Sequence, residues 1–172
     1  MSSQEWLRHT SRPMRPVKID TDAPNVARVW NYLVGGRDNF EADRKAARLL
    51  VSVAPEMAQF GPASRAFLRR TVTYLAAEAG LRQFLDVGTG LPAAGNAHEV
   101  AQAIDPACRV VYVDNDPVVL SHARAVLRST AGEVSYLEAD ARDPESVIAG
   151  ATEISSLAAR RSASKLSRPP TR

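Results

Sequence analysis

The sequence lacks several features that would assign a protein to a class at once. Its 172 residues contain a single cysteine, Cys108, so no internal disulfide can form and no cysteine cluster can hold a metal. No apolar run approaches the roughly 18 residues that a membrane-spanning helix needs. The polar segment 1–16 lacks the apolar core of a secretory signal. We therefore expect one cytoplasmic domain with no membrane partner.

Lysine is also scarce, and nearly all of the positive charge is arginine. The formal net charge is +3, but residues 1–18 contribute +3 and residues 151–172 contribute +4, which leaves −4 for residues 19–150. A domain that binds nucleic acid usually presents a basic face. The acidic middle of the chain does not favour nucleic acid as a partner.

The stretch 84–92 organises the rest of the sequence. It consists of a short apolar strand that ends in Asp86, followed by a turn on Gly88 and Gly90. The pattern predicts a strand over about 82–87 and a helix from about 93 to 103. Strand, glycine turn and helix are typical of a nucleotide-type binding site, because glycine lets a ligand approach the backbone and a helix start offers unpaired N–H groups.

Three helices are predicted before this stretch. The first is expected to be capped by Thr21 or Asp22 with Pro24 in its first turn, the second to be capped by Asn39, and the third to begin at Pro62. Their apolar residues recur at helical spacing, with Leu49, Leu50 and Val53 expected to face inward.

Two further strand–helix units are predicted after it. The β-branched run 109–114 and the segment 134–138 are predicted strands, and a helix is expected to begin at Asp116 and Pro117. Alternating strands and helices imply an α/β fold with a doubly wound, Rossmann-like parallel sheet. We expect a mobile arm over 1–18, a helical lid over 19–80, a partial Rossmann-like domain over 81–150 and a disordered tail over 151–172. One short helix over 153–161 is the alternative within that tail.

An aspartate follows each predicted strand: Asp86, Asp114 and Asp140. In such sheets ligands bind outside the carboxyl ends of the strands, so three carboxylates would border one crevice. A carboxylate can accept hydrogen bonds from a ribose diol, and three acids suit a cationic ligand. The alternative is that each aspartate merely caps its turn.

The glycine turn also fits the dinucleotide pattern, so an NAD-dependent oxidoreductase is weighed. Asp86 would place negative charge near a pyrophosphate, and Pro92 lacks an N–H at the expected helix start. S-adenosylmethionine has no phosphate and carries a sulfonium and an amino group, so it suits the acidic turn better.

The sequence resembles the actinomycete family of S-adenosylmethionine-dependent methyltransferases, which have an N-terminal helical signature region followed by a class I Rossmann-like core. The matching segments are residues 25–40, 42–44, 65–70, 84–92 and 111–117. The resemblance covers about 19–149 and implies a methyltransferase with an unknown methyl acceptor. It also implies that the N-terminal helices close over the cofactor.

The resemblance assigns roles to individual residues. It implies that Asp86, Gly88 and Gly90 border the methionyl part of S-adenosylmethionine, that Asp114 holds the ribose, and that Asp140 faces the adenine. It adds Thr89, Asn115 and Ala141 as neighbours with backbone contacts. Arg65 lies on the third predicted helix, where it either faces solvent or reaches the cofactor carboxylate. No residue stands out as a general base. His98 and His122 lack triad or metal spacing and are expected at the surface.

The chain also departs from the family. Ser64 stands where an asparagine is expected, and family members continue well beyond the point where this sequence stops. We therefore expect a C-terminally truncated member, and a non-catalytic remnant that at most binds cofactor or a partner is the alternative function. Family strands run in the order 3-2-1-4-5, so without a fourth strand the first becomes an edge. Such an edge favours self-association.

Overall fold

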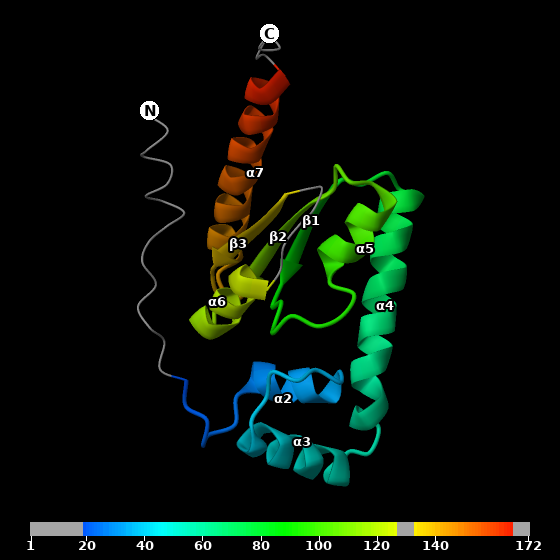
Figure 1. Ribbon diagram of the computed structural model, residues 1–172, viewed down its shortest axis with the longest axis vertical. Helices are drawn as coiled ribbons and strands as arrows, with labels where there is room; N and C mark the ends of the chain where they lie inside the picture. Colours follow the sequence, from blue (N-terminus) through cyan, green and yellow to red (C-terminus); the bar gives the residue numbers. More distant parts are fainter. Residues whose placement is uncertain (1–18, 127–132, 167–172) are drawn as a thin grey trace.

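The computed structural model describes residues 19–126 and 133–166 (Figure 1). Its elements, in chain order, are α2 (Val26–Leu33), α3 (Glu41–Val53), α4 (Met57–Ala77), β1 (Gln83–Val87), α5 (Ala97–Ile104), β2 (Arg109–Asp114), α6 (Pro117–Val126), β3 (Val134–Glu138) and α7 (Pro144–Leu166). The expected mobile arm, 1–18, lies outside the described residues.

The three strands form one parallel sheet in the order β1-β2-β3, which confirms the α/β fold. Leu85 lies opposite Val111, and Tyr112 lies opposite Tyr136. The central strand β2 is buried from Val110 to Asp114, which explains its nearly continuous apolar sequence. Strand β1 is an edge, as expected.

Helices cover both faces of the sheet. Val72 of α4 and Ala101 of α5 pack with Val110 and Tyr112 of β2 on one face. On the other face Val147 of α7 packs against Val111 and Val113 of β2. Helix α7 thus belongs to the core, and the prediction of a disordered tail over 151–172 is wrong as far as Leu166. Residues 167–172 lie outside the described residues.

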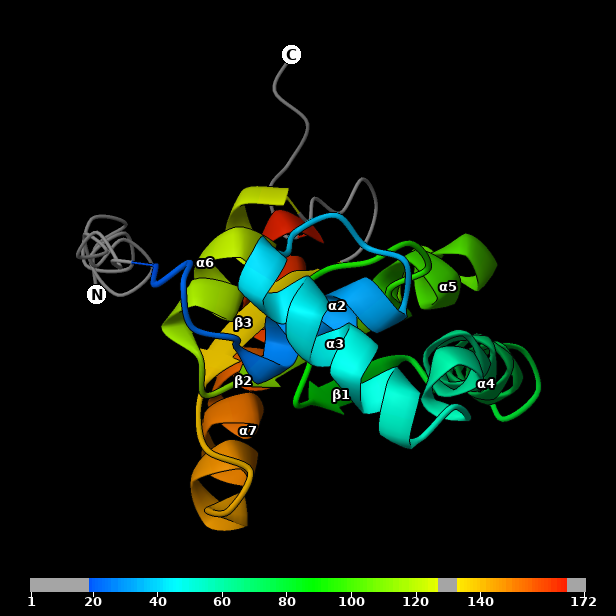
Figure 2. The same ribbon diagram turned by 90° about the horizontal axis from the view of Figure 1, so that it is seen from below.

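The α2–α3 layer, residues 26–53, lies beyond the carboxyl ends of the strands (Figures 1 and 2). Its helices begin later than predicted. Asn25, rather than Thr21 or Asp22, caps α2, because its Oδ1 accepts the backbone N–H groups of Ala27 and Arg28. Phe40, rather than Asn39, is the N-cap of α3, because the Asp43 carboxylate reaches back to the Phe40 N–H.

The predicted inward face of α3 is also wrong in part. Leu49 and Val53 are exposed, whereas Asp43 and Ala47 are fully buried. Helix α4 begins at Met57, so Pro62 lies inside it. Next to that proline, Gly61 packs directly on the Leu33 carbonyl of α2, where a Cβ would come within 2.6 Å of the oxygen.

Candidate functional site at the carboxyl ends of the strands

Asp86, Asp114 and Asp140 lie at the carboxyl ends of three neighbouring parallel strands, as expected. The sheet register staggers them: Asp86 is opposite Tyr112, and Asp114 is opposite Glu138, two residues before Asp140. The structure therefore brings the three aspartates to one edge of the sheet. The carboxyl ends of the strands are directed toward the α2–α3 layer (Figure 1).

The loop after β1 folds onto the end of β2. The N–H groups of Gly88 and Thr89 both donate to the Val113 carbonyl, at 2.9 and 3.2 Å. The Thr89 hydroxyl donates to the same oxygen at 3.1 Å. Gly88 and Gly90 have φ angles of 74° and 64°, in the left-handed region that only glycine adopts easily. The two glycines of the motif are thus required by the turn itself.

Asp114 holds both sides of the crevice. Its Oδ2 accepts the Gly90 N–H at 2.9 Å, and its Oδ1 accepts the Asp116 N–H at 2.9 Å. The residue is buried. Each carboxylate oxygen has two lone pairs, so each can still accept one further hydrogen bond, which is the requirement for a ribose diol.

Asp86 and Arg65 are incompletely paired. Burial raises the pKa of the Asp86 carboxyl, the charge of Arg65 lowers it, and the charge of Asp114 raises it further. Among the described residues the Asp86 carboxylate accepts no hydrogen bond. Arg65 Nη2 donates to the Ala94 carbonyl at 3.0 Å, while its buried Nε has no acceptor in that part of the structure. An unpaired carboxylate and an unpaired N–H in one corner fit a ligand with both a cationic and an anionic end.

Asp140 differs from the other two aspartates. Hydrogen bonds from the Arg142 side chain and backbone hold the pKa of the Asp140 carboxyl well below its usual range, and the Asn115 side chain contributes. The Arg142 Nη2–Asp140 Oδ2 distance is 2.5 Å. Ala141 lies between them on the chain and is exposed. Because Arg142 already neutralises its charge, Asp140 contributes little negative potential to the crevice.

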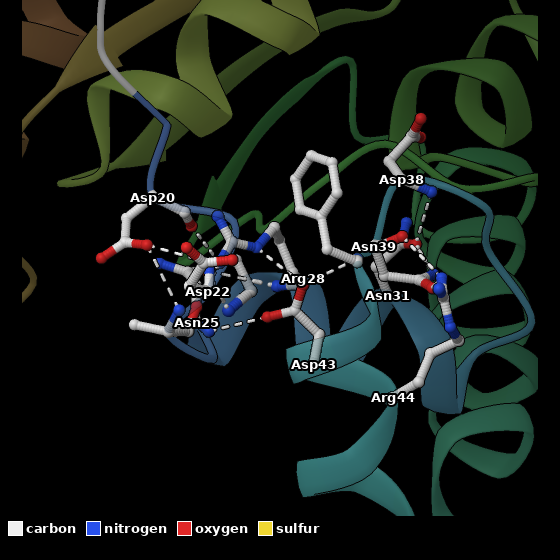
Figure 3. Close-up of polar contacts among 12 residues, drawn as sticks. Asp20, Asp22, Asn25, Arg28, Asn31, Asp38, Asn39, Asp43 and Arg44 are labelled. Carbon is white, nitrogen blue, oxygen red and sulfur yellow. Dashed lines mark hydrogen bonds and ion pairs between the residues drawn. The ribbon is translucent and has the colours of Figure 1, made fainter.

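The α2–α3 layer contains a buried polar network (Figure 3). Arg28 Nε donates to Asp43 Oδ2 at 2.8 Å, and both residues are buried. Arg28 Nη2 also donates to the carbonyls of Asp20 and Ala23. Burial opposes ionisation of Asp43, but the N–H groups of Asn25, Phe40 and Arg28 together keep its pKa below the ordinary value. The network fixes the entry segment 19–25 onto α2 and α3.

A second part of the network lies at the end of α2. Asn31 Oδ1 accepts the Asp38 N–H at 3.0 Å and the Asn39 amide at 2.9 Å, while Arg44 donates to the Asn39 carbonyl (Figure 3). Gly36 is required here, because a Cβ would come within 2.3 Å of the Asn31 amide. The polar residues around the glycine pair therefore shape this loop.

A cavity of about 350 Å³ lies between the segment before α2 and the start of α6. It is lined by residues 19–20, 23–25, 27–28, 91 and 116–119. Asn25 Nδ2 donates to Asp116 Oδ2 across it at 3.3 Å. None of the nine predicted cofactor residues lines this cavity, although Leu91 follows Gly90. Sequence reasoning did not assign Asn25 and Asp116 to the site, although both lie in segments that carry the family resemblance and each precedes a helix.

His98 is buried, contrary to the expected surface position. Its backbone N–H donates to the Tyr112 hydroxyl at 3.0 Å, and that hydroxyl lies 2.8 Å from His98 Nδ1. His122 is half-buried, with Nε2 at 3.3 Å from Asp38 Oδ2. Within residues 19–126 and 133–166, no three His, Cys, Asp or Glu side chains gather in a metal-like cluster, and no helix has the length and hydropathy of a membrane span.

The family model described as S-adenosyl methyltransferase matches residues 12–160. The chain belongs to this family. A DUF574 family protein from Streptomyces avermitilis MA-4680 is 43% identical, with a TM-score of 0.70, over 76% of this chain and 50% of that one. A proposed methyltransferase from Thermobifida fusca YX is 48% identical, with a TM-score of 0.68, over 75% of this chain and 48% of that one.

This member of the S-adenosyl methyltransferase family therefore spans about half the length of these two solved structures. No curated protein matches it. The description of the family implies S-adenosylmethionine as its cofactor and names no methyl acceptor.

Proposed function

We propose that the crevice at the carboxyl ends of β1, β2 and β3 binds S-adenosylmethionine, and that the protein serves methyl transfer to an acceptor not yet identified. The observation that carries this proposal is the unpaired Asp86 carboxylate beside the unpaired Nε of Arg65. When bound, the cofactor supplies a sulfonium methyl group. The chain's own residues bind and orient it, which is the main source of catalysis in such transfers.

In this proposal the predicted residues hold the cofactor as follows. The amino group of the cofactor pairs with Asp86, and its carboxylate pairs with Arg65. The ribose hydroxyls donate to the remaining lone pairs of Asp114. Gly88 and Gly90 border the methionyl part, and Asp140 faces the adenine. Thr89, Asn115 and Ala141 are neighbours that contribute backbone contacts. The division into a lid over 19–80 and a cofactor domain over 81–150 follows from these roles.

The local structure supports S-adenosylmethionine over a dinucleotide. Helix α5 begins at Ala97 rather than near residue 93, so its N-terminus is not continuous with the glycine turn. Glu99 Oε2 already accepts the N–H groups of Gly95 and Asn96 at 2.9 and 3.1 Å. A pyrophosphate would have to displace this carboxylate, so NAD is the weaker candidate.

A non-catalytic role is the second candidate, because no described residue is placed as a general base in the crevice. In that case the chain binds cofactor but transfers no methyl group. The free thiol of Cys108 is buried, which is compatible with the cytoplasm as the compartment of either function.

Isothermal titration of the purified chain with S-adenosylhomocysteine and, separately, with NADH tests the proposal. We expect S-adenosylhomocysteine to bind and NADH to bind at least tenfold more weakly. Tighter binding of NADH, or no binding of S-adenosylhomocysteine, contradicts the proposal. A single-turnover assay with methyl-labelled cofactor and lysate then separates the two roles, since methyl incorporation excludes the non-catalytic one.

A further inference from the structure

The cavity between the segment before α2 and the start of α6 includes none of the residues that we propose to hold the cofactor. Its volume of about 350 Å³ is within the usual range of small-molecule pockets. It adjoins the cofactor crevice along the chain, since Leu91 follows Gly90 and Asp116 is two residues after Asp114. The cavity can therefore be considered as a site of its own.

Both walls of this cavity are held in place by hydrogen bonds within the protein. Arg28 Nη2 donates to the carbonyls of Asp20 and Ala23 at 2.9 and 2.7 Å, which fixes the segment before α2 (Figure 3). On the opposite wall Asp116 Oδ1 accepts the Val118 N–H at 2.8 Å and thus caps α6. A site whose walls are already ordered loses little conformational entropy when a ligand binds.

Most of the lining is aliphatic. Ala27 of α2, Leu91 of the glycine loop, and Val118 and Val119 of α6 contribute to it. Among the described residues no aromatic side chain lines the cavity. Such a lining favours a ligand with an aliphatic body, whose apolar surface leaves water on binding.

Two carboxylates in the lining lack a cationic partner. Asp20 Oδ1 accepts only backbone N–H groups, and Asp116 Oδ2 accepts the Asn25 amide at 3.3 Å, which is long for such a hydrogen bond. In the described part of the chain neither carboxylate has a cationic side chain within ion-pair distance. The guanidinium of Arg28 is paired with Asp43 instead. Negative charge in a partly enclosed site attracts a cation, so the lining favours a ligand with an ammonium group.

Arg28 supplies a hydrogen-bond donor to the same cavity. The residue lines the cavity although it is only 8% exposed. Its Nε and Nη2 have acceptors, but its Nη1 has none within residues 19–126 and 133–166. Because buried polar groups are normally hydrogen-bonded, this N–H favours a ligand that also has a carbonyl or hydroxyl oxygen.

We propose that this cavity is a second ligand site, which binds a small aliphatic amine that also has a carbonyl or hydroxyl oxygen. The ammonium group pairs with Asp116, the oxygen accepts a hydrogen bond from Arg28 Nη1, and the aliphatic body contacts Ala27 and Val118. The inference goes beyond the proposed function and does not rest on it, because none of these residues is assigned to the cofactor.

Titration of leucinamide into the isotope-labelled chain, followed by amide NMR shifts, tests the inference. Leucinamide has an ammonium group, a carbonyl oxygen and an aliphatic body, and isocaproamide is the same molecule without the ammonium group. We expect saturable shifts at the Ala27, Val118 and Val119 amides with leucinamide. Isocaproamide should bind at least fivefold more weakly, because hydrogen bonds to charged groups are the stronger ones.

Asp116→Asn should weaken leucinamide binding at least fivefold and leave isocaproamide binding unchanged. Asparagine caps a helix about as well as aspartate, so the variant retains the start of α6. Asp143→Asn is the matched control, because Asp143 also accepts a backbone N–H at a helix start, that of Ser146, but does not line the cavity. Equal losses of leucinamide affinity in the two variants contradict the assignment of Asp116.

Equal affinities for leucinamide and isocaproamide, or no saturable shift at the Ala27, Val118 and Val119 amides, overturn the inference. Competition between leucinamide and S-adenosylhomocysteine also overturns it, because the cavity would then be part of the cofactor crevice. The outcome is separable from the cofactor proposal, since leucinamide should bind whether or not the chain binds S-adenosylhomocysteine.

Discussion

Asp114 accepts the backbone N–H of Gly90 at 2.9 Å, so the side chain that ends β2 holds the loop that follows β1. The same carboxylate accepts the Asp116 N–H before α6. One residue thus links the glycine loop to the segment that enters α6. A ligand that binds Asp114 finds both loops already in place.

Asp114→Asn should therefore weaken cofactor binding and the loop together. The amide can accept through only one of its two terminal atoms, so either Gly90 or Asp116 loses its partner. We expect S-adenosylhomocysteine to bind at least tenfold more weakly, or about 1.4 kcal/mol, in isothermal titration. The control is Asp105→Asn: Asp105 also accepts a backbone N–H, from Ala107, but before the amino end of β2. Unchanged affinity in Asp114→Asn would exclude Asp114 from the site.

Asp86→Asn should stabilise the fold while weakening cofactor binding. Burial raises the pKa of Asp86 in the folded state above its ordinary value of 3.8, so its contribution to stability is present below pH 3.8 and is lost as pH rises through the folded pKa. At pH 7 the full free-energy cost of burying the charged Asp86 carboxylate is present. Urea denaturation at pH 7 should give a higher midpoint for the variant, together with reduced S-adenosylhomocysteine affinity.

Asp140→Asn should change the stability of the fold in the opposite direction. It is the matched control for Asp86→Asn. The pKa of Asp140 is lowered, so its contribution is present above the unfolded value and is lost as pH falls through the folded one. Its loss should lower the denaturation midpoint at pH 7. If Asp86→Asn also lowers the midpoint, the Asp86 carboxylate has a stabilising partner and is not poised for a ligand.

Arg28→Met should strongly destabilise the α2–α3 layer. It leaves Asp43 charged and fully buried without its arginine, and breaking a buried pair in this way typically costs about 3–5 kcal/mol. Urea denaturation followed by circular dichroism measures the loss. Arg48→Met removes an exposed pair with Glu41 from the same layer and should shift the midpoint little. Equal shifts for the two variants would contradict a structural role of the buried pair.

Stability should fall in mild acid because of His98. Burial lowers the pKa of His98 below its ordinary value of 6.5, so the unfolded chain binds a proton at a pH where the folded chain does not. The free energy of unfolding should then decline as pH falls below 6.5. His98→Gln should flatten this decline, whereas His122→Gln leaves the buried pair with Tyr112 intact. A wild-type slope that persists in His98→Gln would assign it to another group.

The strands and the start of α6 at Pro117 were predictable, whereas the starts of α2, α3, α4 and α5 were not. The β-branched run 109–114 between turn residues matches β2 residue for residue, because a buried parallel strand is apolar throughout. The start of α3 was missed because its cap comes from inside the helix: Asp43 reaches back to Phe40, and that carboxylate is held by Arg28, fifteen residues earlier. Such a cap depends on tertiary contacts that local patterns do not contain.

The dependence on tertiary contacts also explains which parts of the site could be predicted. The acidic strand ends were predictable because parallel strands place their carboxyl ends at one edge. The cavity beside Asn25 and Asp116 was not, because it lies between segments that only the fold brings together. The tail was mispredicted because its composition is polar, although Val147, Ala151 and Ile154 recur at helical spacing and pack on the sheet.

Helix α4 connects the two ends of the molecule as a single rod. Its 21 residues span about 30 Å, from the turn after α3 to the segment that enters β1. Tilting a rod of that length by five degrees displaces its far end by roughly 3 Å, about the length of one hydrogen bond. A shift of α2 and α3 would therefore also move the segment that enters β1. Arg65, which lies midway along α4, would move with either end of the helix.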